Sequence, residues 1–292
     1  MKKFLIIFLL SIFLIGCTKV SVVEPGNNSN INILTSFYPV YLFAENIVDG
    51  AEGVTLKNLT LSSNIGCLHG YHLTTANMKD IENADIFIIN GAGMEESFID
   101  DIRVAYPDLM IIDTSIGVDI LDNTFADEEN PHIWLSVDNA KKQVQNIAYS
   151  LIEVDKENEE VYTSNYESYI NKLNSLKEET NKFYGFNIVA MHDSLSYFAD
   201  STGLNIIDIV QNDEEDVPSP KRLQEIIENI KKNNVKAIFT EEQYSDKLPN
   251  MLSEETNVKV YTFDSITSGE GNKEEYIDRM KNNFDMLLTI SR

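Results

Sequence analysis

The feature that most constrains the fold of this chain is a regular alternation of short β-branched runs with amphipathic stretches. Four runs in the first half have the length of buried strands: Asn32–Ser36, Val54–Leu59, Ile86–Ile89 and Met110–Asp113. Four more follow in the second half: Ile188–Met191, Asn205–Ile209, Ala237–Thr240 and Lys259–Phe263. Strands that alternate with helices are typical of parallel α/β units. The pattern therefore predicts an α/β fold in which four β/α units are followed by four more.

Helical stretches separate these strands. Those within the two halves are Pro39–Val48, Thr75–Glu82, Glu95–Tyr106, Tyr197–Ser201, Pro220–Asn233 and Leu248–Glu255. Between the halves lie two longer amphipathic segments, Val137–Val154 and Glu157–Phe183. A helix of roughly 25 residues is about 38 Å long, enough to run along two stacked domains and to restrict their relative motion. The alternative is a helical hairpin that caps one sheet.

The N-terminal segment has the pattern of an export signal. Lys2 and Lys3 precede an apolar run from Phe4 to Ile15, which is too short for a comfortable transmembrane helix. Leu14-Ile15-Gly16-Cys17 resembles a bacterial lipobox, in which cleavage before Cys17 leaves that cysteine to carry lipid. We therefore predict a lipoprotein signal over residues 1–17 and a flexible tether over 18–30. A plain signal peptide or an anchor helix is the alternative.

Composition narrows the class of protein further. Residues 31–292 are enough for two ordinary domains or one large one, and no second apolar segment is long enough to cross a membrane. Besides Cys17 only Cys67 is present, so the mature chain can form no internal disulfide. The formal net charge of −24, from 47 acidic and 23 basic residues, argues against nucleic-acid binding. Such a surface attracts cations, although acidity can also serve solubility alone.

The chain has only four histidines, and they lie near predicted junctions between elements. His69 and His72 precede the helix that starts at Thr75, His132 precedes the Val137 helix, and His192 directly follows a strand. Ligands of open α/β sheets gather at the carboxyl ends of strands, and imidazole is the commonest metal ligand. No local HxxxH or CxxC pattern is present, and a histidine taken alone can equally be a surface or core residue. These residues therefore indicate an extracellular binder of a metal or small ligand.

Several blocks occur in a fixed order that resembles a known family. They are Ile33–Pro39 (ILTSFYP), His69-x-Tyr71 with Asp80, Ala84–Gly91 (ADIFIING), Asn130–Leu135 (NPHIWL), Met191–Phe198 (MHDSLSYF) and Thr262–Ser265 (TFDS). Together they resemble the cluster A-I zinc and manganese substrate-binding lipoproteins of ABC importers, over nearly the whole chain after the tether. The resemblance implies two lobes, each with a four-stranded parallel sheet flanked by helices, bridged by one long rigid helix. The corresponding boundaries are 31–154, 155–185 for the linking helix, and 186–292.

The resemblance also implies a site and a role. The metal would lie between the lobes on His69, His132, His192 and Asp264, two residues from each half. Histidine at position 192, where manganese-selective relatives tend to have a carboxylate, favours zinc, with manganese as the other candidate. The protein would be a monomer, anchored by lipid on the extracytoplasmic face of a bacterial cell membrane. There it would deliver the ion to the permease of an ABC importer.

Departures from the family pattern suggest additional roles. Leu68 and Gly70 flank His69 where relatives usually have proline and an acidic residue. His72 is a candidate auxiliary ligand, and Glu241 is a reserve carboxylate. Cys67 is either a soft ligand or a small buried residue, and Trp134 is expected in the core. Each ligating imidazole also needs a partner on its other nitrogen, for which the candidates are Thr35, Asp193, Ser194 and Glu241.

Two other functions are consistent with some of these residues. A zinc hydrolase would bind the ion with three histidines and a water, but the sequence contains no HExxH or nucleophile-elbow motif. We therefore predict that the chain is not an enzyme. A surface adhesin or antigen with a structural metal is the other alternative. Chelation would unfold a protein of that kind, whereas a transport protein would stay folded and lose stability.

Overall fold

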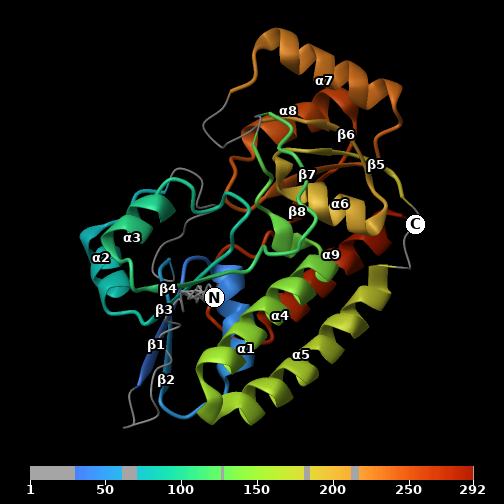
Figure 1. Cartoon of the computed structure of the whole chain (residues 1–292). Helices are drawn as coiled ribbons and strands as arrows, with labels where there is room; N and C mark the ends of the chain where they lie inside the picture. The colour runs from blue at the N-terminus through green and yellow to red at the C-terminus, as the bar shows by residue number, and fades with distance from the viewer. Residues whose placement is uncertain (1–29, 61–70, 126–127, 181–184, 212–216, 292) are drawn as a thin grey trace, which may run out of the picture.

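Two parallel sheets with the same strand order organise the chain (Figure 1). The computed structural model describes residues 30–60, 71–125, 128–180, 185–211 and 217–291. The first sheet has the order β2-β1-β3-β4 and consists of β1 (Ile31–Thr35), β2 (Val54–Asn58), β3 (Ile86–Ile89) and β4 (Met110–Asp113). The second has the order β6-β5-β7-β8 and consists of β5 (Asn187–Ala190), β6 (Asn205–Ile209), β7 (Ala237–Glu241) and β8 (Val260–Phe263). The predicted pair of four-stranded parallel sheets is thus confirmed.

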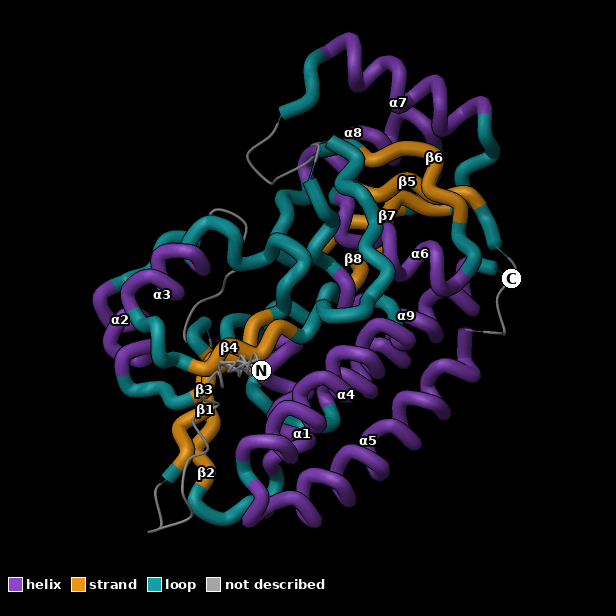
Figure 2. Tube along the Cα trace, in the orientation of Figure 1, coloured by secondary structure: helices purple, strands orange, loops and turns teal. Residues whose placement is uncertain are grey.

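Helices cover both faces of each sheet (Figure 2). Their bounds are α1 (Tyr38–Val48), α2 (Thr75–Glu82), α3 (Ile99–Ala105), α4 (Val137–Val154), α5 (Glu159–Thr180), α6 (Ser196–Thr202), α7 (Pro220–Lys232), α8 (Lys247–Thr256) and α9 (Glu275–Ile290). Three short 3-10 helices are η1 (Ile133–Leu135), η2 (Lys156–Asn158) and η3 (Asp193–Leu195). Apolar side chains of α2 and α3 pack on one face of the first sheet, and those of α7 and α8 on one face of the second. The other helices share the core between the sheets.

A single apolar core joins the two halves. In β3, Ile86 and Ile88 face this shared core, whereas Phe87 and Ile89 face the helices on the outer side. The shared core continues through Trp134, which is fully buried as predicted, to Phe263 of β8. The halves therefore bury part of their apolar surface jointly, in addition to the separate clusters on their outer faces.

Helix α5 bridges the two halves, as predicted. Its 22 residues correspond to about 33 Å of helix. Near its start, the side-chain amide of Asn165 donates hydrogen bonds to the carbonyls of Ile47 and Asp49 at the end of α1. Further along, α5 packs against α9, and Lys172 forms an ion pair with Glu274. The predicted end of this helix, Phe183, lies outside the described residues.

Helix α3 is shorter than the predicted Glu95–Tyr106. The helix begins only at Ile99, because the preceding residues form turns. Phe98, directly before the helix, has φ −146° and ψ −12°, outside the right-handed helical region. The carboxylate of Glu95 accepts hydrogen bonds from the backbone N–H groups of Asn90 and Gly91, at 2.8 and 3.0 Å. Glu95 thus stabilises the turn after β3 and lies before the helix.

Glu95 is also a buried acid, with 2% of its surface exposed. Burial, opposed by hydrogen bonds from Ser36, Asn90 and Gly91, raises the pKa of Glu95 from 4.5 to about 7. Because the folded state holds this proton more tightly than the unfolded chain, ionisation of Glu95 destabilises the fold as pH rises from about 4.5 to about 7.

We expect the pH profile of stability to change in Glu95→Gln. Between pH 5 and 8, the stability of the wild type should fall relative to the variant by roughly 3 kcal/mol, which corresponds to the pKa shift of Glu95. Urea unfolding at several pH values measures this difference. Parallel profiles for the two proteins would show that Glu95 is already ionised at pH 5.

Within the described ranges, no helix is long and apolar enough to cross a membrane.

Candidate metal centre

His132 lies at the start of η1, in the segment that leads from the first sheet into α4. Its side chain is buried, with 3% of the residue exposed. The side-chain oxygen of Asn130 accepts hydrogen bonds from the His132 backbone N–H at 3.1 Å and from ring Nδ1 at 2.9 Å. Because Nδ1 donates to this oxygen, the lone pair of a neutral His132 ring is on Nε2.

His192 lies two residues after the end of β5, at the carboxyl end of a central strand of the second sheet. Its Nδ1 is 3.3 Å from the carboxylate of Glu241, the last residue of the neighbouring strand β7. The same carboxylate accepts hydrogen bonds from Ser194 Oγ at 2.6 Å and from Gln243 Nε2 at 2.8 Å. Burial alone would raise the pKa of Glu241, but the hydrogen bond and charge of His192 and the Ser194 hydroxyl outweigh burial and lower it. The carboxylate oxygens of Glu241 thus accept from three side chains, and acceptance from Nδ1 of a neutral His192 ring directs its lone pair to Nε2.

The two imidazoles, far apart in sequence, meet in the folded chain. Their ring centroids are 4.9 Å apart and the ring planes are nearly perpendicular, at 87°. A zinc ion bound tetrahedrally by two Nε2 atoms at 2.0–2.1 Å would hold the ring centroids roughly 5 Å apart. The observed pair therefore fits two ligands of one ion.

Asn130 ties the two histidine segments together. Its side-chain amide donates a 3.0 Å hydrogen bond to the carbonyl of Asp193, next to His192. Its own carbonyl accepts a 2.7 Å hydrogen bond from the hydroxyl of Tyr197. One buried asparagine thus orients the His132 ring and fixes its distance from the second half of the chain.

The other predicted site residues are placed differently. Asp264 follows β8, and its carboxylate is bound by Arg279 of α9. His72 is exposed, just before α2. His69, Cys67 and Cys17 lie outside the described residues. Among the residues that the structure does describe, no group of three or more His, Cys, Asp or Glu side chains is arranged to hold a metal ion.

Several neighbours of the histidines differ from the predicted partners. Of the four candidates, Glu241 contacts a histidine ring directly, and Ser194 bonds Glu241. The Thr35 hydroxyl instead donates to the carbonyl of Lys57, and the Asp193 carboxylate accepts from Thr124 and Ser196. Asn130 was not predicted as a partner. The sequence could have indicated this partner, because an Asn side chain readily accepts a hydrogen bond from the backbone N–H group two residues later.

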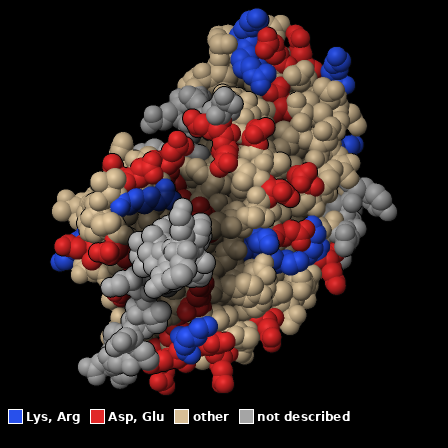
Figure 3. Space-filling model, viewed as in Figure 1, with Lys and Arg blue, Asp and Glu red and all other residues tan. Residues whose placement is uncertain are grey.

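The surface around these residues is acidic overall. Figure 3 shows acidic side chains spread over both halves of one face, whereas basic side chains form a few separate clusters. With a net charge of −24, this surface raises the local concentration of cations. Such attraction does not distinguish one divalent cation from another.

The two sheets have the same strand order, share a core and are bridged by a long helix, and a buried imidazole from each half meets the other. Together these features define a two-lobed substrate-binding protein. The family described as "Zinc-uptake complex component A periplasmic" matches residues 33–289. The chain belongs to this family, which confirms the resemblance drawn from its sequence blocks.

Relatives and solved structures agree with this assignment. The chain is 27% identical to the high-affinity zinc uptake system protein ZnuA of Bacillus subtilis, over 94% of this chain and 95% of that protein. It is 25% identical to the manganese-binding lipoprotein MntA of Halalkalibacterium halodurans, over 97% and 96%. The laminin-binding adhesin Lmb of Streptococcus agalactiae has the same fold, with a TM-score of 0.79 at 23% identity over 90% of this chain and all of that one. The substrate-binding protein FpvC of Pseudomonas aeruginosa, solved with Mn²⁺, has a TM-score of 0.78 at 24% identity, over 90% and 99%.

Proposed function

We propose that this protein captures a transition-metal ion, with zinc as the preferred cargo and manganese as the second candidate, and passes it to the permease of an ABC importer. It acts as a monomer on the extracytoplasmic face of the cell membrane, anchored by lipid at Cys17. The observation that carries the proposal is the buried pair formed by His132 and His192, whose spacing suits one shared ion.

The proposed ligands are His69, His132, His192 and Asp264. Three imidazoles and one carboxylate suit zinc, because softer nitrogen ligands favour it whereas manganese favours oxygen. The rigid partners of both described histidines, Asn130 and Glu241, support this role, since ligating histidines usually donate their other ring N–H to such an acceptor. Glu241 thus serves better as the partner of His192 than as a reserve ligand.

The comparisons support transport over the alternatives. The family is one of uptake components, and relatives are named for zinc and for manganese. These names favour a carrier over a zinc hydrolase. The likeness to the adhesin Lmb is one of fold and carries no assignment of adhesion to this chain.

Metal removal provides the test. Calorimetric titration of residues 31–292 with zinc should give one ion per chain. After chelation, the circular dichroism spectrum should remain that of a folded protein. Unfolding free energy should rise by about 2.7 kcal/mol when free zinc is a hundred times its dissociation constant. Unfolding upon chelation would instead indicate a structural metal, and absence of zinc and manganese binding would contradict the proposed function.

A further inference from the structure

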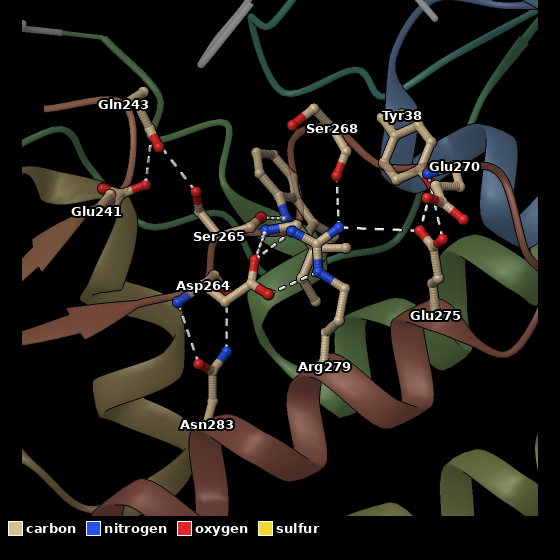
Figure 4. A network of polar contacts seen from close by, with 12 residues as sticks. Tyr38, Glu241, Gln243, Asp264, Ser265, Ser268, Glu270, Glu275, Arg279 and Asn283 are labelled. Atoms are coloured by element: carbon tan, nitrogen blue, oxygen red, sulfur yellow. Dashed lines mark hydrogen bonds and ion pairs between the residues drawn. The ribbon is translucent and has the colours of Figure 1, made fainter. Parts of the chain in front are cut away.

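The carboxylate of Asp264 is engaged by an arginine from a different element (Figure 4). Arg279 Nε donates to Oδ2 of Asp264 at 2.6 Å, and Nη2 of the same guanidinium donates to Oδ1. Oδ1 also accepts a 2.9 Å hydrogen bond from the backbone N–H of Ile266. Both oxygens of a proposed ligand thus accept hydrogen bonds, and the bidentate ion pair with Arg279 is a strong charge-assisted contact.

Arg279 is itself held in place. Its Nη1 donates to the carbonyl of Ser268, and lies 3.9 Å from the Glu275 carboxylate one helical turn earlier. Glu275 in turn accepts a hydrogen bond from the hydroxyl of Tyr38 at the start of α1. The Arg279 side chain is only 22% exposed. The guanidinium is therefore a fixed neighbour of Asp264, unlike a surface cation that solvent screens.

We propose that Arg279 determines metal selectivity by competing for the carboxylate of Asp264, so that manganese is disfavoured more than zinc. This inference rests on the proposed function, because it takes Asp264 as a ligand. A bound ion must share Asp264 with the guanidinium or displace it. Manganese gains more of its binding free energy from oxygen ligands, whereas zinc binds imidazole well. Weakening the bond between the ion and Asp264, the one carboxylate among the proposed ligands, therefore lowers the affinity for manganese more than the affinity for zinc.

The positive charge of Arg279 has a second effect that must be separated from the first. A guanidinium repels every divalent cation to about the same extent, because Coulomb repulsion depends on charge and distance. That repulsion lowers both affinities and leaves their ratio unchanged. The ratio of the manganese to the zinc dissociation constant therefore reports competition for Asp264 alone.

The test is to measure both dissociation constants for Arg279→Gln, by competition against metal-sensitive chelators. We expect the manganese-to-zinc ratio to fall about tenfold, the size of one lost charge-assisted contact. Arg279→Lys keeps the charge but loses the bidentate contact with the carboxylate. Its manganese-to-zinc ratio should therefore lie between those of the wild type and Arg279→Gln. In an Asp264→Asn background, Arg279→Gln should leave the ratio unchanged, because the competed carboxylate is gone.

Arg222→Gln is the matched control. Arg222 of α7 forms an ion pair with the buried Asp208 of β6, through both terminal nitrogens of its guanidinium. This substitution removes the same charge and leaves another aspartate without its arginine, so both metal affinities should change equally. An unchanged ratio in Arg279→Gln, or a fall of the ratio in Arg222→Gln as large as that in Arg279→Gln, would overturn the inference while leaving the proposed function intact. Failure of the wild type to bind either metal would overturn both. If Arg279→Gln does not fold, Arg279→Lys decides the question.

Discussion

His132→Ala should lower the zinc affinity of the protein by several orders of magnitude. The substitution removes one of the two imidazoles that converge, and water must then replace a nitrogen ligand. The loss should be confined to binding, because Asn130 can still bond Asp193 and so preserve the link between the two halves. Competition with a chelator of known affinity measures the change, and metal analysis should find one zinc in the wild type only.

His72→Ala is the comparison for this prediction. It also removes an imidazole, but from an exposed position before α2. We expect a far smaller loss of zinc affinity than in His132→Ala, and any measurable loss would support the auxiliary role predicted for His72. An equal loss in both variants would show that His72 is a full ligand and would contradict its merely auxiliary role. Unchanged affinity in His132→Ala would refute the proposed ligand set.

Trp134→Ala should destabilise the fold by about 3–5 kcal/mol, as for other buried large-to-alanine substitutions. The side chain is fully buried in the shared core, edge-on to Phe37 with ring centroids 4.9 Å apart. Its indole N–H donates a 2.8 Å hydrogen bond to the carbonyl of Ser265, in the other half of the chain. The variant therefore loses apolar packing and a contact that crosses between the halves. Urea unfolding of the metal-free protein measures the loss.

Two variants make this measurement specific. Trp134→Phe keeps a ring but loses the hydrogen bond to Ser265, so it should cost less than Trp134→Ala. Tyr149→Ala removes an aromatic ring that is 54% exposed on α4 and should cost only about 1 kcal/mol. A similar loss in Tyr149→Ala and Trp134→Ala would show that the halves do not depend on a common core.

The sequence predicts most strands to within a residue, because parallel strands buried on both faces appear as short apolar runs with clear limits. The start of α3 could not be predicted in this way, since a single side chain, Glu95, binds back to the preceding turn. Helix α9 was not predicted, although Tyr276, Met280, Phe284 and Leu287 recur at helical spacing and are all buried. The sequence therefore contains the apolar periodicity that predicts this helix.

The candidate metal site, too, could be predicted from the sequence only in part. The order of the sequence blocks predicts that His132 and His192 belong to one site; the structure brings their rings together, and their role as ligands stays a prediction. The contribution of His69 stays a prediction. The ion pair of Asp264 with Arg279 could not be predicted, because it depends on how α9 packs beside the end of β8. Local patterns do not encode such a contact between elements.

Helix α9 has a consequence for when the protein becomes functional. The hydroxyl of Tyr276 donates to the carbonyl of Trp134, and its ring packs edge-on against Phe43 of α1, with centroids 4.8 Å apart. Side chains of α9 thus complete a core to which β1 and α1 also contribute. Contacts so distant in sequence form late, and they slow folding. A chain that emerges N-terminus first, from a ribosome or through a membrane, must therefore deliver α9 before it can assemble a stable ion-binding form.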